Sequence, residues 1–114
     1  MNANHMKECI TACMDCSNEC QKMLFNYCAQ KGGEHTKQDH LKLMADCIQI
    51  CQIAADFMIR NSPFHKNICE LCAKICEACA ESCENLKDKE MQECANICRS
   101  CAESCRSMGK MQCC

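Results

Sequence analysis

The spacing of the cysteines is the feature that most constrains how this chain can fold. Eighteen of its 114 residues are cysteines, and most recur at steps of three or four positions. An α-helix makes a turn in about 3.6 residues, so such steps keep side chains on one face of a helix. The sequence therefore predicts several helices whose buried stripe is formed by sulfur, in the place where leucine ordinarily lies.

Four segments carry this pattern, and breaks in the chain separate them. We expect helices over residues 4–30, 36–60, 63–86 and 88–108. Short connections between them favour an all-α, antiparallel up-down-up-down four-helix bundle with a cysteine-lined core. We expect one domain over residues 1–109, followed by a flexible C-terminal tail over 110–114.

Residues typical of helix starts lie at three of the predicted boundaries. Thr36 and Asp39 have the spacing of a capping box. Ser62 is a candidate N-cap with Pro63 as the first helical residue, and Asp88 can cap the last helix. Gly32 and Gly109 are typical of the residue that follows the end of a helix.

Composition and charge exclude several classes of protein. The net charge is −2 with both signs interspersed, so there is no basic stripe for nucleic acid. No apolar run approaches the roughly 18 residues that span a membrane. The N-terminal residues lack the pattern of a signal peptide, which predicts a cytoplasmic protein whose thiols stay reduced.

The cysteines of the four stripes are candidate metal ligands. Cys28 lies slightly off the first stripe, and the sequence Cys-x-x-Cys-Ala-Glu-Ser-Cys at 76–83 recurs at 98–105 as an internal repeat. The full candidate set is Cys9, Cys13, Cys16, Cys20, Cys28, Cys47, Cys51, Cys69, Cys72, Cys76, Cys79, Cys83, Cys94, Cys98, Cys101 and Cys105.

Soft sulfur ligands in such quantity favour Cu(I), which accepts two or three thiolates. If neighbouring ions share thiolates, the chain would bind roughly nine to eighteen Cu(I) ions. Neutral thiols can form a buried core without metal, whereas bare thiolates could not be buried at acceptable cost. Each Cu(I) should therefore displace protons, and loading should weaken at low pH.

Other cysteine chemistries fit the spacing less well. Zinc or cadmium sequestration remains an alternative, although the Cys-x-x-Cys pairs lie in mid-helix and not on turns. The spacings typical of iron–sulfur ligation are absent. A disulfide bundle would need an oxidising compartment, and a thiol oxidoreductase would need a βαβ pattern that the sequence does not show.

Methionine and histidine residues gather at the predicted ends of the bundle. One end would bring together Met23, His40, Met44 and Met91, as weaker ligands suited to an entry mouth. The other end would gather Met6, Met58, His65 and Met108, so the sequence does not decide which end opens. We expect His5 and His35 to be solvated. Cys113 and Cys114 are either a copper hand-off tail or an inert end.

The second predicted helix is apolar on more than one face. Its additional residues either widen the core or, as we favour, pack against another subunit. They are Ile48, Ile50, Ile53, Phe57 and Ile59.

Three stretches resemble the bacterial copper storage proteins, specifically their cytosolic branch. They are Cys9-Ile-Thr-Ala-Cys13-Met-Asp-Cys16, then Ser62-Pro63-Phe64 leading into Ile68-Cys69-Glu-Leu-Cys72-Ala-Lys-Ile-Cys76-Glu-Ala-Cys79, and Cys98-Arg-Ser-Cys101-Ala-Glu-Ser-Cys105-Arg-Ser-Met108. The resemblance covers nearly the whole chain. It implies four-helix bundles that assemble as homotetramers and bind many Cu(I) ions through the core cysteines.

This resemblance also marks departures. Relatives can carry cysteines where this chain has Met23, His40 and Met91, which implies a softer, mixed-ligand mouth here. The expected function is non-enzymatic storage and detoxification of Cu(I) in the cytosol. A Cu(I) chaperone that delivers a few ions through Cys113 and Cys114 is the alternative from another class.

Overall fold

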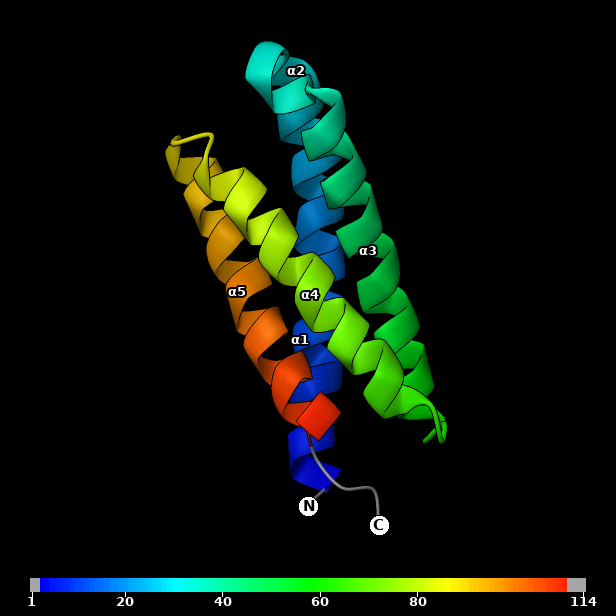
Figure 1. Ribbon diagram of the computed structural model, residues 1–114. Coiled ribbons are helices and arrows are strands. Elements are labelled where there is room, and N and C mark those ends of the chain that lie inside the picture. Colours follow the sequence, from blue (N-terminus) through cyan, green and yellow to red (C-terminus); the bar gives the residue numbers. More distant parts are fainter. Residues whose placement is uncertain (1–2, 111–114) are drawn as a thin grey trace.

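The computed structural model describes residues 3–110 as helices joined by short turns. The long helices are α1 (Ala3–Met23), α3 (Gln38–Ile59), α4 (His65–Glu84) and α5 (Lys89–Lys110). Figure 1 shows them running alternately up and down in a bundle. The principal extents of the bundle are 47 × 18 × 18 Å. Helix α1 packs against α3 and α5, and α4 packs against the same two helices. The predicted all-α antiparallel four-helix bundle is confirmed.

The core runs along the bundle axis and consists mainly of cysteine. All sixteen cysteines of the described residues have no solvent-exposed surface, and alanines and methionines fill the space between them. A neutral cysteine behaves as a small hydrophobic residue, so its burial drives folding as that of an aliphatic side chain does. Among residues 3–110, no helix is both long enough and apolar enough to cross a membrane.

A π-helical turn explains how Cys28 reaches this core. Eight residues separate Cys20 from Cys28, and in a regular α-helix that interval overshoots two turns by about 80°. The structure has a π-helix, η1, over Leu24–Cys28, between α1 and the short α2 (Ala29–Lys31). A π-turn holds more residues than an α-turn. The wider turn removes the excess rotation and returns Cys28 to the inner face, where it is fully buried.

The predicted starts of the second and third helices are wrong by two residues. Thr36 lies in a 3-10 turn, η2 (Gly33–Thr36), and its hydroxyl donates to the Gly33 carbonyl at 3.1 Å. Helix α3 begins after the extended residue 37. The Ser62 side chain accepts from the Phe64 amide at 3.1 Å, so it closes a turn, and Pro63 stays outside α4.

The last helix starts where the sequence predicts but ends later. The Gln92 amide donates to the Asp88 carbonyl at 3.0 Å, which is the first bond of α5. Gly109 does not end this helix: it lies inside α5, where a Cβ would come within 2.5 Å of Glu70 Cγ. The absent side chain allows α4 and α5 to approach closely. The two terminal cysteines, Cys113 and Cys114, lie outside the described residues.

The additional apolar residues of α3 divide between core and surface. Ile50 is 7% exposed and belongs to the core, and Ile48 packs against it from a half-buried position. Ile53 and Phe57 are half-buried, whereas Ile59 is 61% exposed. The wider core contact therefore accounts for Ile48 and Ile50.

Candidate metal centre

The buried cysteines form a continuous column of thiols along the bundle axis. Four groups have all their sulfur atoms within 4.8 Å of one another. Neighbouring groups share Cys16, Cys101 or Cys105, so no group is isolated from the next. The groups are Cys16/Cys20/Cys47/Cys98, Cys16/Cys51/Cys76/Cys101, Cys13/Cys72/Cys101/Cys105 and Cys9/Cys69/Cys105.

The distances between sulfur atoms suit bridging by a metal ion. The shortest are 3.3 Å between Cys13 and Cys105 and 3.5 Å between Cys51 and Cys76. These exceed the roughly 2.05 Å of a disulfide bond, and every described cysteine is free. A metal–sulfur bond is about 2.3 Å long for zinc, so two sulfurs on either side of an ion lie at most about 4.6 Å apart.

A mixed set of ligands caps the column where the end of α1 meets the start of α3. The Cys28 sulfur lies 3.6 Å from Nε2 of His40 and 3.7 Å from the sulfur of Met91. The Met44 sulfur lies 3.6 Å from that of Cys79 and 3.7 Å from that of Cys83. The structure thus brings His40, Met44 and Met91 to this end, as the topology predicted.

The His40 ring is oriented by a partner outside the column. Its Nδ1 lies 2.8 Å from the hydroxyl of Ser82, which leaves Nε2 directed at Cys28. Burial lowers the pKa of His40 below its ordinary value, so the ring is neutral at pH 7 and can offer a lone pair to a metal. Such a partner on the second nitrogen is typical of metal-binding histidines.

Burial raises the pKa of the Cys28 thiol to about 12, and the nearby Cys83 and Cys94 add to this effect. Cys28 is therefore protonated at neutral pH in the metal-free protein. A buried thiol can stay neutral without a counter-charge, whereas a buried thiolate needs a cation. The column is thus stable when empty and becomes a ligand set as metal replaces protons.

Sequence reasoning missed a polar cluster that closes the same end. The Tyr27 hydroxyl donates to Oδ2 of Asp88 and lies 3.2 Å from Oε1 of Glu90. Nε2 of His35 lies 3.0 Å from the same Asp88 oxygen, and its ring packs edge-on against Tyr27. These contacts tie the connection between α1 and α3 to the turn between α4 and α5. His35 is half-buried, so its expected solvation is wrong.

The electrostatics of this cluster follow from its hydrogen bonds. The bond to the Asp88 carboxylate raises the pKa of Tyr27. Burial opposes ionisation of Asp88, but the bonds from Tyr27 and His35 outweigh it and lower the pKa of the carboxyl group. No local sequence signal links Tyr27 to Asp88, because 61 residues separate them.

The opposite end holds the same two ligand types, three methionines and one histidine. Met58, His65 and Met108 are buried there and Met6 is half-buried, close to the group formed by Cys9, Cys69 and Cys105. Nδ1 of His65 lies 2.8 Å from the Ser62 carbonyl. His5 is half-buried, so the expectation that it is solvated is wrong. Met23, at 8% exposure, belongs to the same core as the cysteines.

Comparison with known proteins connects this geometry to a family. The sequence matches the family described as copper storage protein over residues 2–110. A cysteine-rich protein of Bacillus subtilis (strain 168), YhjQ, described as uncharacterized, is 40% identical over 69 residues, which are 60% of this chain. That match spans 63% of the relative's length, which is less than two thirds.

Solved structures resemble the whole bundle. The crystal structure of the Nmul_A1745 protein from Nitrosospira multiformis has a TM-score of 0.92 and 42% identity, over 97% of this chain and all of that one. The Cu(I)-bound copper storage protein BsCsp3 has a TM-score of 0.85 and 39% identity, over 92% of this chain and 98% of that one. Apo-Csp3 from Bacillus subtilis has a TM-score of 0.81 and 39% identity, over 90% of this chain and 97% of that one. The chain belongs to the copper storage protein family, as its cysteine-rich stretches predicted.

Proposed function

We propose that this chain stores many Cu(I) ions on the thiolates of its core and thereby keeps them from damaging other molecules. The observation that carries the proposal is the unbroken column of buried, free thiols, whose groups overlap through shared sulfurs. A carrier of one or two ions needs a few accessible ligands, whereas a column of this length offers a site at every level. The role requires no catalysis, and we propose that the protein is not an enzyme.

The ligands that we assign are the sixteen core cysteines, with Met23, His40, Met44 and Met91 as weaker ligands at one end. Thioether and imidazole ligands bind Cu(I) less tightly than thiolates do. An ion held by Cys28, His40 and Met91 would therefore exchange more readily than one held by thiolates alone. This difference in affinity supports an entry and exit mouth at the end of the bundle where α1 ends and α3 begins.

An anaerobic titration of the fully reduced protein against a chromophoric Cu(I) chelator tests the proposal. We expect ten or more tightly bound ions per chain, because sixteen thiols that share ions support that range. A capacity of one to four ions would favour a chaperone. Failure to compete with the chelator, together with tight zinc or cadmium binding, would identify the four-cysteine groups as sites for those ions.

The chaperone alternative assigns delivery to Cys113 and Cys114. Removal of residues 111–114 leaves α5 intact and should leave the storage capacity nearly unchanged. A matched variant with both terminal cysteines replaced by serine separates the loss of thiols from the loss of length. If capacity collapses in either variant while the helical content is retained, the storage proposal is contradicted.

We also propose that the protein acts in the cytoplasm and assembles as a homotetramer through α3. The half-buried Ile53 and Phe57 and the exposed Ile59 support an interface on this helix. Light scattering after size exclusion should give four times the chain mass. Ile59→Lys should shift the protein to smaller species, whereas the exposed control Gln49→Lys should not.

A further inference from the structure

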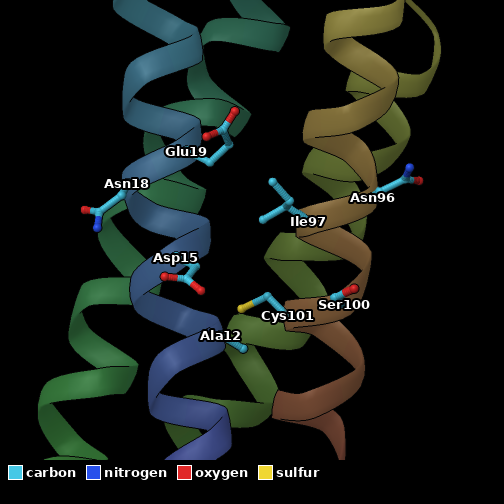
Figure 2. A pocket seen from close by; sticks show the side chains of 8 residues that line it. All are labelled: Ala12, Asp15, Asn18, Glu19, Asn96, Ile97, Ser100 and Cys101. Atoms are coloured by element: carbon cyan, nitrogen blue, oxygen red, sulfur yellow. The ribbon is translucent and has the colours of Figure 1, made fainter.

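A groove runs between α1 and α5, away from both ends of the bundle. Figure 2 shows the side chains that line it, and its cavity volume is about 580 Å³. Helix α1 contributes Ala12, Asp15 and Glu19, and α5 contributes Ile97 and Cys101. The groove is therefore a lateral feature that the proposed storage function leaves unassigned.

The floor of the groove holds a core thiol. Cys101 lines it, with its sulfur directed toward α1 (Figure 2), although the side chain has no solvent-exposed surface. The same sulfur lies 3.8 Å from that of Cys13 and 3.8 Å from that of Cys51. Cys101 belongs to two of the four-cysteine groups. A metal ion that reached this sulfur would join the middle of the column directly.

The rim of the groove is acidic. Asp15 is exposed and Glu19 is half-buried, and both line the groove from α1. Figure 2 shows the Glu19 side chain extending from α1 toward α5. Lys22 lies 3.4 Å from Glu19 and offsets part of its charge. No lysine or arginine is among the groove-lining residues that the structure describes. A rim of this sign attracts cations and repels anionic complexes.

Two apolar side chains extend into the groove beside the thiol and form a small barrier. Ala12 projects toward α5 and Ile97 projects toward α1 across the groove (Figure 2). Ile97 is half-buried, so a change of its rotamer does not require the core to open. Side-chain rotations of this kind are fast compared with helix motions.

We propose that this groove is a lateral port through which Cu(I) enters the middle of the column by way of Cys101. The proposal rests on the storage function and adds a second route to it. At the port a Cu(I)–sulfur bond to Cys101 forms as the bond between the ion and its incoming ligand breaks. The thiol proton passes to the released ligand or to water. Copper stays in the +1 state throughout, so no oxidant or reductant takes part.

Filling the groove tests its role in loading. Stopped-flow loading of the reduced full chain from the cationic Cu(I)–acetonitrile complex should slow by about tenfold in Ala12→Leu, with unchanged final capacity. Ala45→Leu adds the same volume at an exposed position of α3 and should load as the wild type does. Ile97→Val shortens the barrier and should speed loading. Unchanged rates in both groove variants would refute the port.

A second pair of variants changes charge without changing shape. Asp15→Asn with Glu19→Gln should slow loading from the cationic complex by about tenfold at low salt, and less at high salt. The same double variant should speed transfer from an anionic Cu(I)–bicinchoninate complex. Asp39→Asn with Asp46→Asn removes equal charge from exposed positions of α3 and serves as the control.

If the groove double variant and the α3 control double variant change the loading rate equally, the rim has no special role and the proposal is wrong. These rate measurements are independent of the storage function, which depends on capacity alone. A wild-type capacity below four ions would refute storage whatever the rates. A high capacity with unaltered rates would refute only the port.

Discussion

Copper loading should weaken as the pH falls, because the thiols that bind copper carry protons in the metal-free core. Burial, with Cys83 and Cys94 nearby, raises the pKa of Cys28 to about 12. At pH 7.5 a thiol with that pKa is ionised in only about one molecule in 30,000. A Cu(I)–thiolate bond to such a thiol therefore displaces a proton as it forms.

The size of the effect follows from the number of protons displaced per ion. One proton changes the apparent affinity tenfold, or about 1.4 kcal/mol, per pH unit. From pH 8.0 to pH 6.0 an ion that displaces one proton loses about 2.7 kcal/mol of binding free energy. An ion placed between two thiols, such as Cys51 and Cys76 at 3.5 Å, loses about 5.4 kcal/mol if both protons leave.

The measurement combines two readouts on one sample. Competition against a chelator calibrated at each pH gives the affinity at pH 6.0, 7.0 and 8.0. Titration in weakly buffered solution with a pH indicator dye gives the protons released per ion, which should be one to two. Affinity that is independent of pH, with no release of protons, would show that the thiols are ionised before metal arrives and would refute a neutral core.

Three further predictions concern the metal-free protein. Its stability should fall between pH 9 and 12, because the raised pKa keeps Cys28 neutral in the folded state while the unfolded thiol ionises near pH 9. Urea unfolding measures the free energy of unfolding at pH 8 and at pH 11. Its decrease between the two pH values should be about 3 kcal/mol smaller in Cys28→Ala than in the wild type. Tyr27→Phe should raise the pKa of Asp88, which NMR titration measures. The same substitution should speed hydrogen exchange in residues 24–37. Gly109→Ala should destabilise by about 1–2 kcal/mol in thermal unfolding but stabilise in a Glu70→Ala background, where the clash with the Glu70 side chain is absent.

The sequence predicted the parts of the fold that depend on periodicity. Steps of three and four placed the stripe cysteines on inner helix faces, and the antiparallel topology correctly brought Met44 and Met91 to one end with His40. These predictions succeed because a stripe is a local property and a bundle with short turns has few possible arrangements.

The features that the sequence did not predict depend on tertiary contacts. Ser62 and Thr36 are typical N-cap residues, but each forms a turn bond outside the helix, so the helix begins two residues later. Gly109 is typical of a helix end, yet here it makes room for Glu70 from the neighbouring helix. The expected solvation of His35 failed for the same reason, because its partner Asp88 lies 53 residues away.

The π-turn at the end of α1 has a consequence for changes in chain length. A regular α-helix over the same stretch would need one residue fewer to bring Cys28 to the same face. Deletion of Asn26 should therefore be absorbed by conversion of the π-turn to an α-turn, with Cys28 still facing inward. The stretch between Cys9 and Cys20 is regular α-helix and has no π-turn that could absorb a one-residue deletion. Such a deletion would rotate the residues on one side of it by about 100° and move thiols to the surface. Tolerance of this helix to a one-residue deletion should thus be confined to the single turn over Leu24–Cys28.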